Sequence, residues 1–301
     1  VQIKQSEIRG NNFFVNLPLS YVAADRNYLD FFLHYGLCPE VGLDAFVLEN
    51  REPNWHQKIA AELEHRQLKC SLHLPFCDLQ PGSMDPYILE ASRKRLASAL
   101  EIAALYKPCL LVGHAYFTPL YRDCVSKWLE LSIATWSRLL DSWPEHPPLC
   151  LENTRETDPQ VLLSLLEGLS NYRAGICFDV GHWFSFAQGK SRQNLEEWIA
   201  CLAPYIYHLH LSDNKGTNDQ HLGLGQGGIP WQEFFALLAK YNLGPSFTLE
   251  PHNKSALQQG LQFLSQHPDW VGRCCLDFDG LKRVSLQVSN DNHFVLGVDK
   301  D

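Results

Sequence analysis

The chain has 301 residues, of which 45% are hydrophobic and 20% are charged, so it can bury a sizeable core and is not disordered by composition. No run approaches the roughly 18 apolar residues of a membrane-spanning helix, and the first ten residues lack the apolar core of a signal peptide. The net charge of −9 opposes the phosphate-neutralising surface that general DNA binding needs. We therefore expect a soluble, cytoplasmic protein that binds neither membranes nor nucleic acid.

Eight short apolar runs predict buried strands, and longer segments with helical periodicity lie between them. In chain order, the predicted strands are 13–17, 44–48, 69–74, 109–112, 149–151, 175–178, 206–211 and 246–249. The clearest predicted helices are 85–106, 122–140, 158–169, 194–202 and 231–241. Asp85-Pro86 and Asp158-Pro159 each place a capping acid before a proline, which is typical of a helix start.

Strands that are buried on both faces and separated by helices imply a parallel sheet, and eight such repeats match a closed (β/α)₈ TIM barrel. A doubly wound open sheet is the alternative, but no Gly-x-Gly-x-x-Gly follows the first strand. We predict one barrel over residues 1–280. Residues 281–301 alternate in polarity, which predicts a small β-like appendage of unknown role.

The ten cysteines predict free thiols and not a disulfide framework. A chain of this size needs no cross-links, and it has no Cys-x-x-Cys pair. Cys70, Cys109, Cys150 and Cys177 lie in apolar runs, where a free cysteine behaves as a small buried hydrophobe.

Side chains of the metal-ligand type follow six successive predicted strands. They are His73, His114, Glu152, Asp179 with His182, His210 and Glu250, and a loop adds Asp219 and His221. Because the carboxyl ends of barrel strands meet at one mouth, these nine side chains should converge. A single histidine beside a strand is usually structural, but several buried charges together need pairing or a metal. Imidazole and carboxylate ligands predict Zn²⁺, Mn²⁺, Fe²⁺ or Co²⁺.

Four further residues are weaker candidates. His208 lies two residues before His210 and so faces the same side one layer deeper, which predicts hydrogen-bond support of a ligand. His252, Lys215 and Trp183 follow strand ends and are candidates for substrate contact. Solvent exposure or helix capping explains His252 and Lys215 equally well, and loop packing explains Trp183 equally well.

With these motifs, the chain resembles the xylose-isomerase-like TIM-barrel superfamily. That superfamily includes the endonuclease IV type of apurinic endonucleases (AP endonuclease family 2) and many sugar-phosphate isomerases and epimerases. The resemblance runs from the first strand to the eighth. It is carried by Ser71-Leu72-His73, Gly113-His114, Leu151-Glu152-Asn153, Phe178-Asp179-Val180-Gly181-His182, His208-Leu209-His210-Leu211-Ser212-Asp213, Asp219-Gln220-His221-Leu222-Gly223-Leu224-Gly225-Gln226-Gly227 and Leu249-Glu250-Pro251.

The resemblance to the endonuclease branch implies two to three metal ions per chain, with Glu152 bridging two of them. His73 and His114 would complete one ion, Asp179, His210 and Glu250 the second, and His182, Asp219 and His221 would hold the third. Gln226 stands where that branch usually carries Glu. This difference and the net negative charge of the chain argue against a DNA endonuclease.

The expected function is hydrolysis of a phosphoester or phosphodiester of a small molecule at the multinuclear site, with Glu152 and Glu250 as the catalytic carboxylates. The alternative is a sugar or sugar-phosphate isomerase or epimerase, in which a single metal polarises a carbonyl and the same two carboxylates move protons. The nine-ligand set favours the hydrolase, because proton transfer between sugar carbons does not need three metals. A non-catalytic barrel that binds a metal-chelated ligand is the third possibility.

Overall fold

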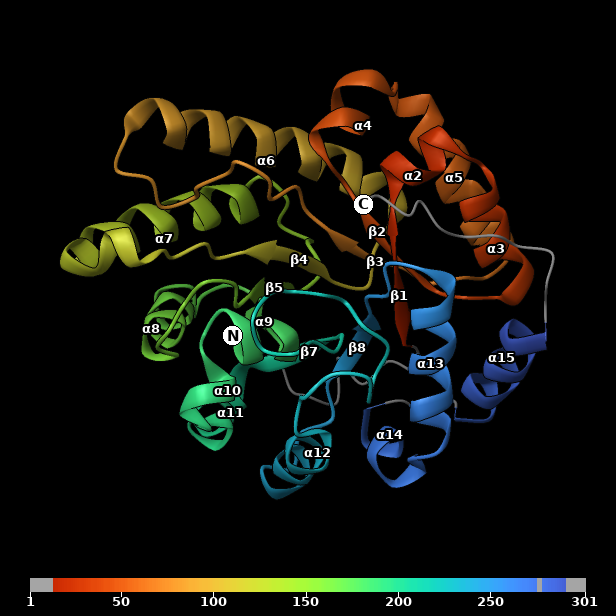
Figure 1. Ribbon diagram of the computed structural model, residues 1–301. Helices are drawn as coiled ribbons and strands as arrows, with labels where there is room; N and C mark the ends of the chain where they lie inside the picture. The colour runs from red at the N-terminus through yellow and green to blue at the C-terminus, as the bar shows by residue number, and fades with distance from the viewer. Residues whose placement is uncertain (1–12, 275–277, 291–301) are drawn as a thin grey trace.

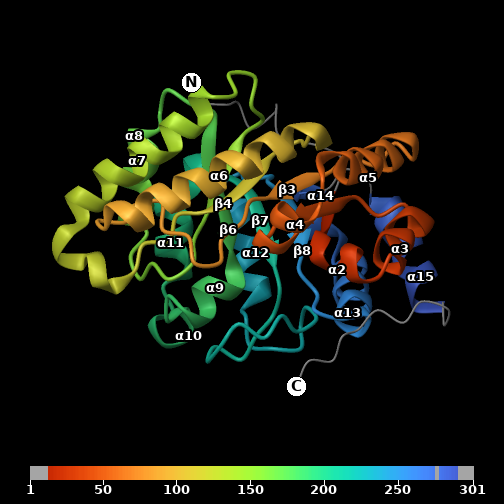
Figure 2. The same cartoon turned by 90° about the horizontal axis from the view of Figure 1, so that it is seen from above.

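The computed structural model describes residues 13–274 and 278–290. Eight parallel strands close into a barrel in sequence order, and each is followed by at least one helix on the outside (Figures 1 and 2). The strands are β1 (Phe14–Pro18), β2 (Pro39–Gly42), β3 (Ser71–His73), β4 (Leu111–His114), β5 (Leu149–Glu152), β6 (Ala174–Asp179), β7 (Ile206–Leu211) and β8 (Ser246–Leu249). The predicted (β/α)₈ barrel is confirmed.

Most of the outer helices bury an apolar stripe against the strands. They are α2 (Leu19–Ala24), α3 (Asn27–Tyr35), α4 (Ala45–Asn50), α5 (Pro53–His65), α6 (Pro86–Tyr106), α7 (Val125–Asp141), α8 (Gln160–Gly168), α9 (Val180–Ser185), α10 (Gly189–Arg192), α11 (Leu195–Leu202), α12 (Trp231–Lys240), α13 (Lys254–Ser265), α14 (Pro268–Cys274) and α15 (Phe278–Asn290), with 3₁₀ turns at η1 (Pro119–Cys124) and η2 (Ala203–Tyr205). The Asp85 carboxylate caps α6 as expected, accepting hydrogen bonds from the amides of Tyr87 and Ile88 at 2.8 and 3.3 Å.

The second strand was wrongly placed by the sequence pattern. Residues 44–48 were expected to be a strand, but Asp44 accepts a hydrogen bond from the Val47 amide at 3.0 Å and caps α4. The strand is Pro39–Gly42 instead. Proline is tolerated at a strand's first residue, and Gly42 lets β1 approach closely, because a Cβ there would lie 3.3 Å from the Pro18 Cα.

The C-terminal segment is helical where the structure describes it, which corrects the predicted β-like appendage. Leu281 and Val288 of α15 are fully buried, Val284 lies between them on the same face, and the helix packs against α13 and α3. The helical spacing of these three residues therefore outweighs the alternating pattern once α13 offers an apolar surface. Residues 291–301 of the predicted appendage lie outside the described residues.

The cysteines with described side chains are free thiols. Cys70, Cys150 and Cys177 are buried as expected, whereas Cys109 is exposed. Across the described ranges, every helix is too short or too polar to cross a membrane.

Inside the barrel, apolar side chains fill the lower layer and polar side chains the upper layers. Val112, Cys150 and Cys177 pack with Leu110 and Tyr207. One layer above lie buried polar groups, and above these the strand ends open at the mouth. The closed apolar floor therefore confines the polar chemistry to the carboxyl ends of the strands.

Candidate metal centre

Glu152, at the end of β5, lies at the centre of the predicted ligands. One carboxylate oxygen, Oε2, is 3.1 Å from His73 Nε2 and 3.0 Å from His114 Nε2. The other, Oε1, is 2.9 Å from His182 Nδ1. The side chain is almost completely buried. Oε2 thus faces the first predicted ligand group and Oε1 faces His182 of the third, so this carboxylate connects two of the predicted groups.

His210, at the end of β7, is surrounded by carboxylates from three other strands. Its Nδ1 is 3.2 Å from Glu250 Oε1, 3.6 Å from Glu152 Oε2 and 3.9 Å from Asp179 Oδ2. The structure therefore brings together the second predicted ligand group as well.

Asp179 ends β6 and caps α9, and this explains how its two oxygens are directed. Its Oδ1 accepts a hydrogen bond from the His182 amide at 2.6 Å. The Asn153 side chain donates to the Asp179 carbonyl at 2.9 Å and accepts from the Asp179 amide at 2.8 Å, which locks the two strand ends together. Asp179 Oδ2 is buried without a hydrogen-bond partner. It is therefore available to a metal ion.

The third predicted group is built by the loop after β7. Asp219 Oδ2 is 2.7 Å from His221 Nε2 and 3.3 Å from His182 Nε2. The ring of His221 is oriented by its Nδ1, which lies 2.9 Å from the Glu250 carbonyl oxygen, and its backbone is in the left-handed region. Asp219 thus links the loop to the ligands at the end of β6.

Buried Asp213 holds this loop in place. Its Oδ2 accepts hydrogen bonds from the Gly225 amide and the Trp231 indole, both at 2.9 Å, and its backbone pairs with Leu222. At Gly227 a Cβ would lie 2.1 Å from the Asp213 carboxylate, so only glycine fits there. The Gly-rich segment therefore positions Asp219 and His221.

The charge balance of the centre fits divalent cations. Burial raises the pKa of Asp179 to about 8, and the nearby Glu250 carboxylate acts in the same direction against His182. Glu250 Oε2 and Asp219 Oδ1 are further buried oxygens without a hydrogen-bond partner. Buried carboxylates without donors are costly unless a cation neutralises them. Imidazole nitrogens and carboxylate oxygens are suitable donors for Zn²⁺, Mn²⁺, Fe²⁺ or Co²⁺.

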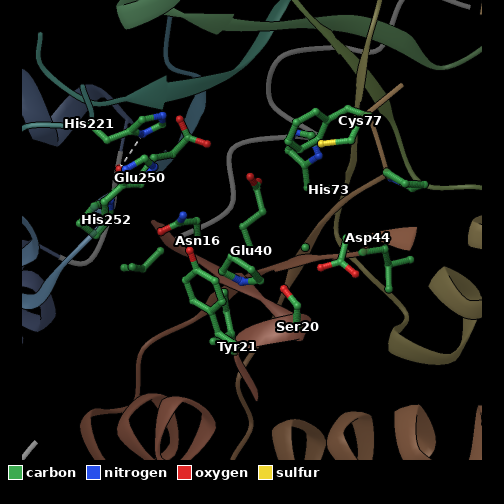
Figure 3. Close-up of a pocket in the computed structure, with 18 of the residues that line it drawn as sticks. Asn16, Ser20, Tyr21, Glu40, Asp44, His73, Cys77, His221, Glu250 and His252 are labelled. Atoms are coloured by element: carbon green, nitrogen blue, oxygen red, sulfur yellow. Dashed lines mark hydrogen bonds between the residues drawn. The ribbon is translucent and has the colours of Figure 1, made fainter. Parts of the chain in front are cut away.

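A cavity of about 470 Å³ opens directly over these residues. It is bordered by seven of the nine predicted ligands, while Asp179 and His210 lie fully buried beneath them. Figure 3 shows His221, Glu250 and His252 on one side of the cavity and His73 on the other, with Glu40 between them. The predicted metal centre is therefore the inner wall of a substrate-sized pocket.

Comparison with known proteins identifies the family. The family model for the xylose isomerase-like TIM barrel matches residues 37–267. The chain belongs to this family.

Its relatives include uncharacterised and named proteins. It is 26% identical over 223 residues to the uncharacterised protein MJ1311 of Methanocaldococcus jannaschii, covering 71% of this chain and 75% of the relative. It is 27% identical over 177 residues to probable endonuclease 4 of Natranaerobius thermophilus, covering 52% and 61%.

Among solved structures, a D-tagatose 3-epimerase-like protein superposes with a TM-score of 0.71 at 22% identity, covering 87% of this chain and 98% of that one. The TTHB071 protein of Thermus thermophilus, from a crystal soaked with ZnCl₂, superposes with a TM-score of 0.64 at 26% identity, covering 85% and 97%. Both neighbours share the barrel fold.

Glu40 is a site residue of this xylose isomerase-like barrel that the sequence pattern missed. It is buried on β2, with Oε1 2.9 Å from His210 Nε2. Its Oε2 accepts hydrogen bonds from the hydroxyls of Ser71 at 2.8 Å and Thr248 at 2.9 Å. A carboxylate on one ring nitrogen of a histidine directs the other nitrogen, here Nδ1, towards a metal. Asp44 was the signal that could have revealed Glu40. If Asp44 is interpreted as a helix cap, the second strand must end before it, and Glu40 then lies on that strand.

The weaker candidates separate clearly in the structure. His208 hydrogen-bonds Ser246 and Thr248 through its two ring nitrogens, and neither is a predicted ligand. Thr248 in turn donates a hydrogen bond to Glu40. His252 borders the cavity and stacks on the His221 ring, with the centroids 3.9 Å apart. Lys215 is exposed and Trp183 is buried beside Gly189, and neither borders the cavity. Their expected substrate contacts are therefore not supported.

We expect Glu40→Gln to weaken metal binding by about 10- to 100-fold while the barrel stays folded, because the neutral amide orients His210 less strongly. Competition with a chromophoric chelator would measure this affinity. Ser71→Ala is the matched control, since it removes one hydrogen bond to Glu40 but leaves its contact with His210, and its effect should be smaller. Unchanged metal affinity in Glu40→Gln would contradict the orienting role.

Proposed function

We propose that this protein hydrolyses a phosphoester or phosphodiester of a small molecule at a centre of two to three divalent ions. The position of Glu152 carries the proposal, because its two oxygens contact different histidines, His73 and His114 on one side and His182 on the other. A one-metal isomerase needs only the ligands around His210. It would leave the other two groups, which are His73 with His114 and His182 with Asp219 and His221, without a ligand role.

Four of the predicted ligands have specific roles in the proposed reaction, in addition to holding metal ions. When bound, divalent ions would supply Lewis acidity for the phosphoryl oxygens and lower the pKa of water. Glu152 holds the groups together, and the loop residues Asp219 and His221 close the centre on the side facing the cavity. Glu250 keeps one oxygen on His210 and leaves Oε2 without a hydrogen-bond partner, so it can accept a proton from water.

A small substrate agrees with the charge of the chain better than DNA does. The net charge is −9, and Gln226 differs from the Glu usual in the endonuclease branch. A small phosphoester needs only the local positive charge of the bound ions. The relative named probable endonuclease 4 therefore does not by itself make DNA the expected substrate.

A sugar or sugar-phosphate isomerase or epimerase is the second candidate. Glu152, Asp179 and Glu250 converge on one nitrogen of His210, which is enough to hold a single metal. The solved neighbours also include D-psicose 3-epimerases, at 14% and 16% identity, so their likeness shows the fold. This candidate requires proton exchange at a sugar carbon, which the hydrolase does not.

The decisive experiment compares the two reactions on one preparation. We expect protein loaded with Zn²⁺ or Mn²⁺ to release product from a panel of small phosphomonoesters and phosphodiesters, and to incorporate no solvent deuterium into ketoses or ketose phosphates. Phosphate release and NMR would measure the two activities, and metal-free protein is the control. Deuterium incorporation with no phosphoester cleaved would replace the hydrolase with the isomerase.

A further inference from the structure

The cavity continues beyond the predicted metal ligands into a second region. It extends between β1, β2 and the helices α2, α3 and α4, where its walls are mainly apolar. We call this region the aromatic lobe, and define it by Tyr21, Tyr28, Phe31, Phe32, Leu43 and Phe76. Figure 3 shows Tyr21 on the side of the cavity away from His221. The proposed chemistry uses none of these side chains.

Two aromatic side chains of the lobe are only partly covered by protein. Tyr21 is 41% exposed and Phe76 is 42% exposed, although both line a concave surface. The rings of Tyr21 and Tyr28 lie 5.2 Å apart, and they join α2 to α3. Aromatic surface that is exposed inside a pocket gains free energy when a ligand covers it.

Phe76 connects the lobe to the metal centre. Its ring stacks on His114 with the centroids 4.4 Å apart, and lies edge-on to His73 at 5.3 Å. A group that leaves the metal centre in this direction therefore passes directly over an aromatic surface.

Two charged side chains beside the lobe, Asp44 and Arg95, have protein partners. Asp44 accepts the hydrogen bond that caps α4, and Arg95 is paired with Glu49 at 2.6 Å. The remaining wall includes the aliphatic side chains of Leu43 and Leu79 and the two small polar side chains of Asn16 and Ser20. A polyol needs several hydrogen-bonding partners to replace water, and such a wall suits an apolar ring better.

From these observations we propose that the aromatic lobe binds an apolar, ring-bearing part of the substrate. The substrate class is then a phosphoester whose anionic group reaches the metal centre while a flat apolar group fills the lobe. The cavity of about 470 Å³ lies within the size range of pockets for such ligands. This inference rests on the proposed hydrolase function.

Binding of two phosphonates that cannot be hydrolysed would test the lobe separately from catalysis. We expect metal-loaded protein to bind 1-naphthylmethylphosphonate at least about 10-fold more tightly than methylphosphonate in calorimetry. Tyr21→Ala should remove most of this preference and leave the affinity for methylphosphonate unchanged, while Tyr21→Phe should keep it. Tyr87→Ala is the matched control, because Tyr87 is 86% exposed outside the cavity and should affect neither ligand.

Three results would overturn the proposal. They are equal affinity for the two phosphonates, tighter binding of a ketose phosphate than of the naphthyl ligand, and a Tyr21→Ala effect confined to the oligomeric state in sedimentation velocity. Phosphoester hydrolysis is measured independently. A preference for the naphthyl ligand that Tyr21→Ala removes would support ring binding by the aromatic lobe even if no phosphoester were cleaved. Hydrolysis without that preference would support only the proposed hydrolase function.

Discussion

Glu152→Gln is expected to lower phosphoester hydrolysis by at least about 10³-fold and to reduce the bound metal by at least one ion per chain. The amide has nearly the same volume but cannot bridge cations through two charged oxygens. Wild-type protein should carry two to three ions. Steady-state product release and elemental analysis of dialysed protein would measure the two effects, and thermal unfolding should remain cooperative.

Glu156→Gln is the matched control for this substitution. Glu156 is also buried just after β5, but its carboxylate accepts hydrogen bonds from the Thr154 and Phe117 amides and belongs to none of the predicted ligand groups. We expect this variant to keep the full metal content. Wild-type turnover and metal content in Glu152→Gln would refute the central role of the carboxylate.

His221→Ala should reduce kcat by about 10²- to 10³-fold if the loop helps to hold a catalytic ion. The substitution removes the partner that lies 2.7 Å from Asp219 Oδ2. His252→Ala is the comparison, because His252 stacks on His221 and borders the cavity but lies outside the predicted ligand set. It should mainly raise KM.

The division between kcat and KM separates the two candidate functions. If His221→Ala raised KM and left kcat unchanged, His221 would contact substrate and a third ion would have no role in turnover. That result would favour the isomerase, in which the ligands around His210 suffice. Metal analysis of the same variant would show whether an ion had been lost.

Chain order and residue type were enough to predict the barrel and the convergence of the nine candidate ligands, whereas their division into ion groups came from the family resemblance. In a parallel barrel every strand ends at the same mouth, so a polar residue after each apolar run is placed without knowledge of side-chain packing. Glu152 and His210 could be located in this way. The number of ions that these residues hold is still a prediction.

Only the tertiary structure decided the features that depend on contacts between distant segments. Glu40 precedes His210 by 170 residues in sequence, yet Glu40 Oε1 lies 2.9 Å from His210 Nε2. The closed barrel makes this possible, because only β1 and β8 separate β2 from β7. Residues 281–290 alternate in polarity, but packing against α13 made them helical. A local pattern shows which residues are apolar or polar, whereas the partners that satisfy them are set by the closed barrel as a whole.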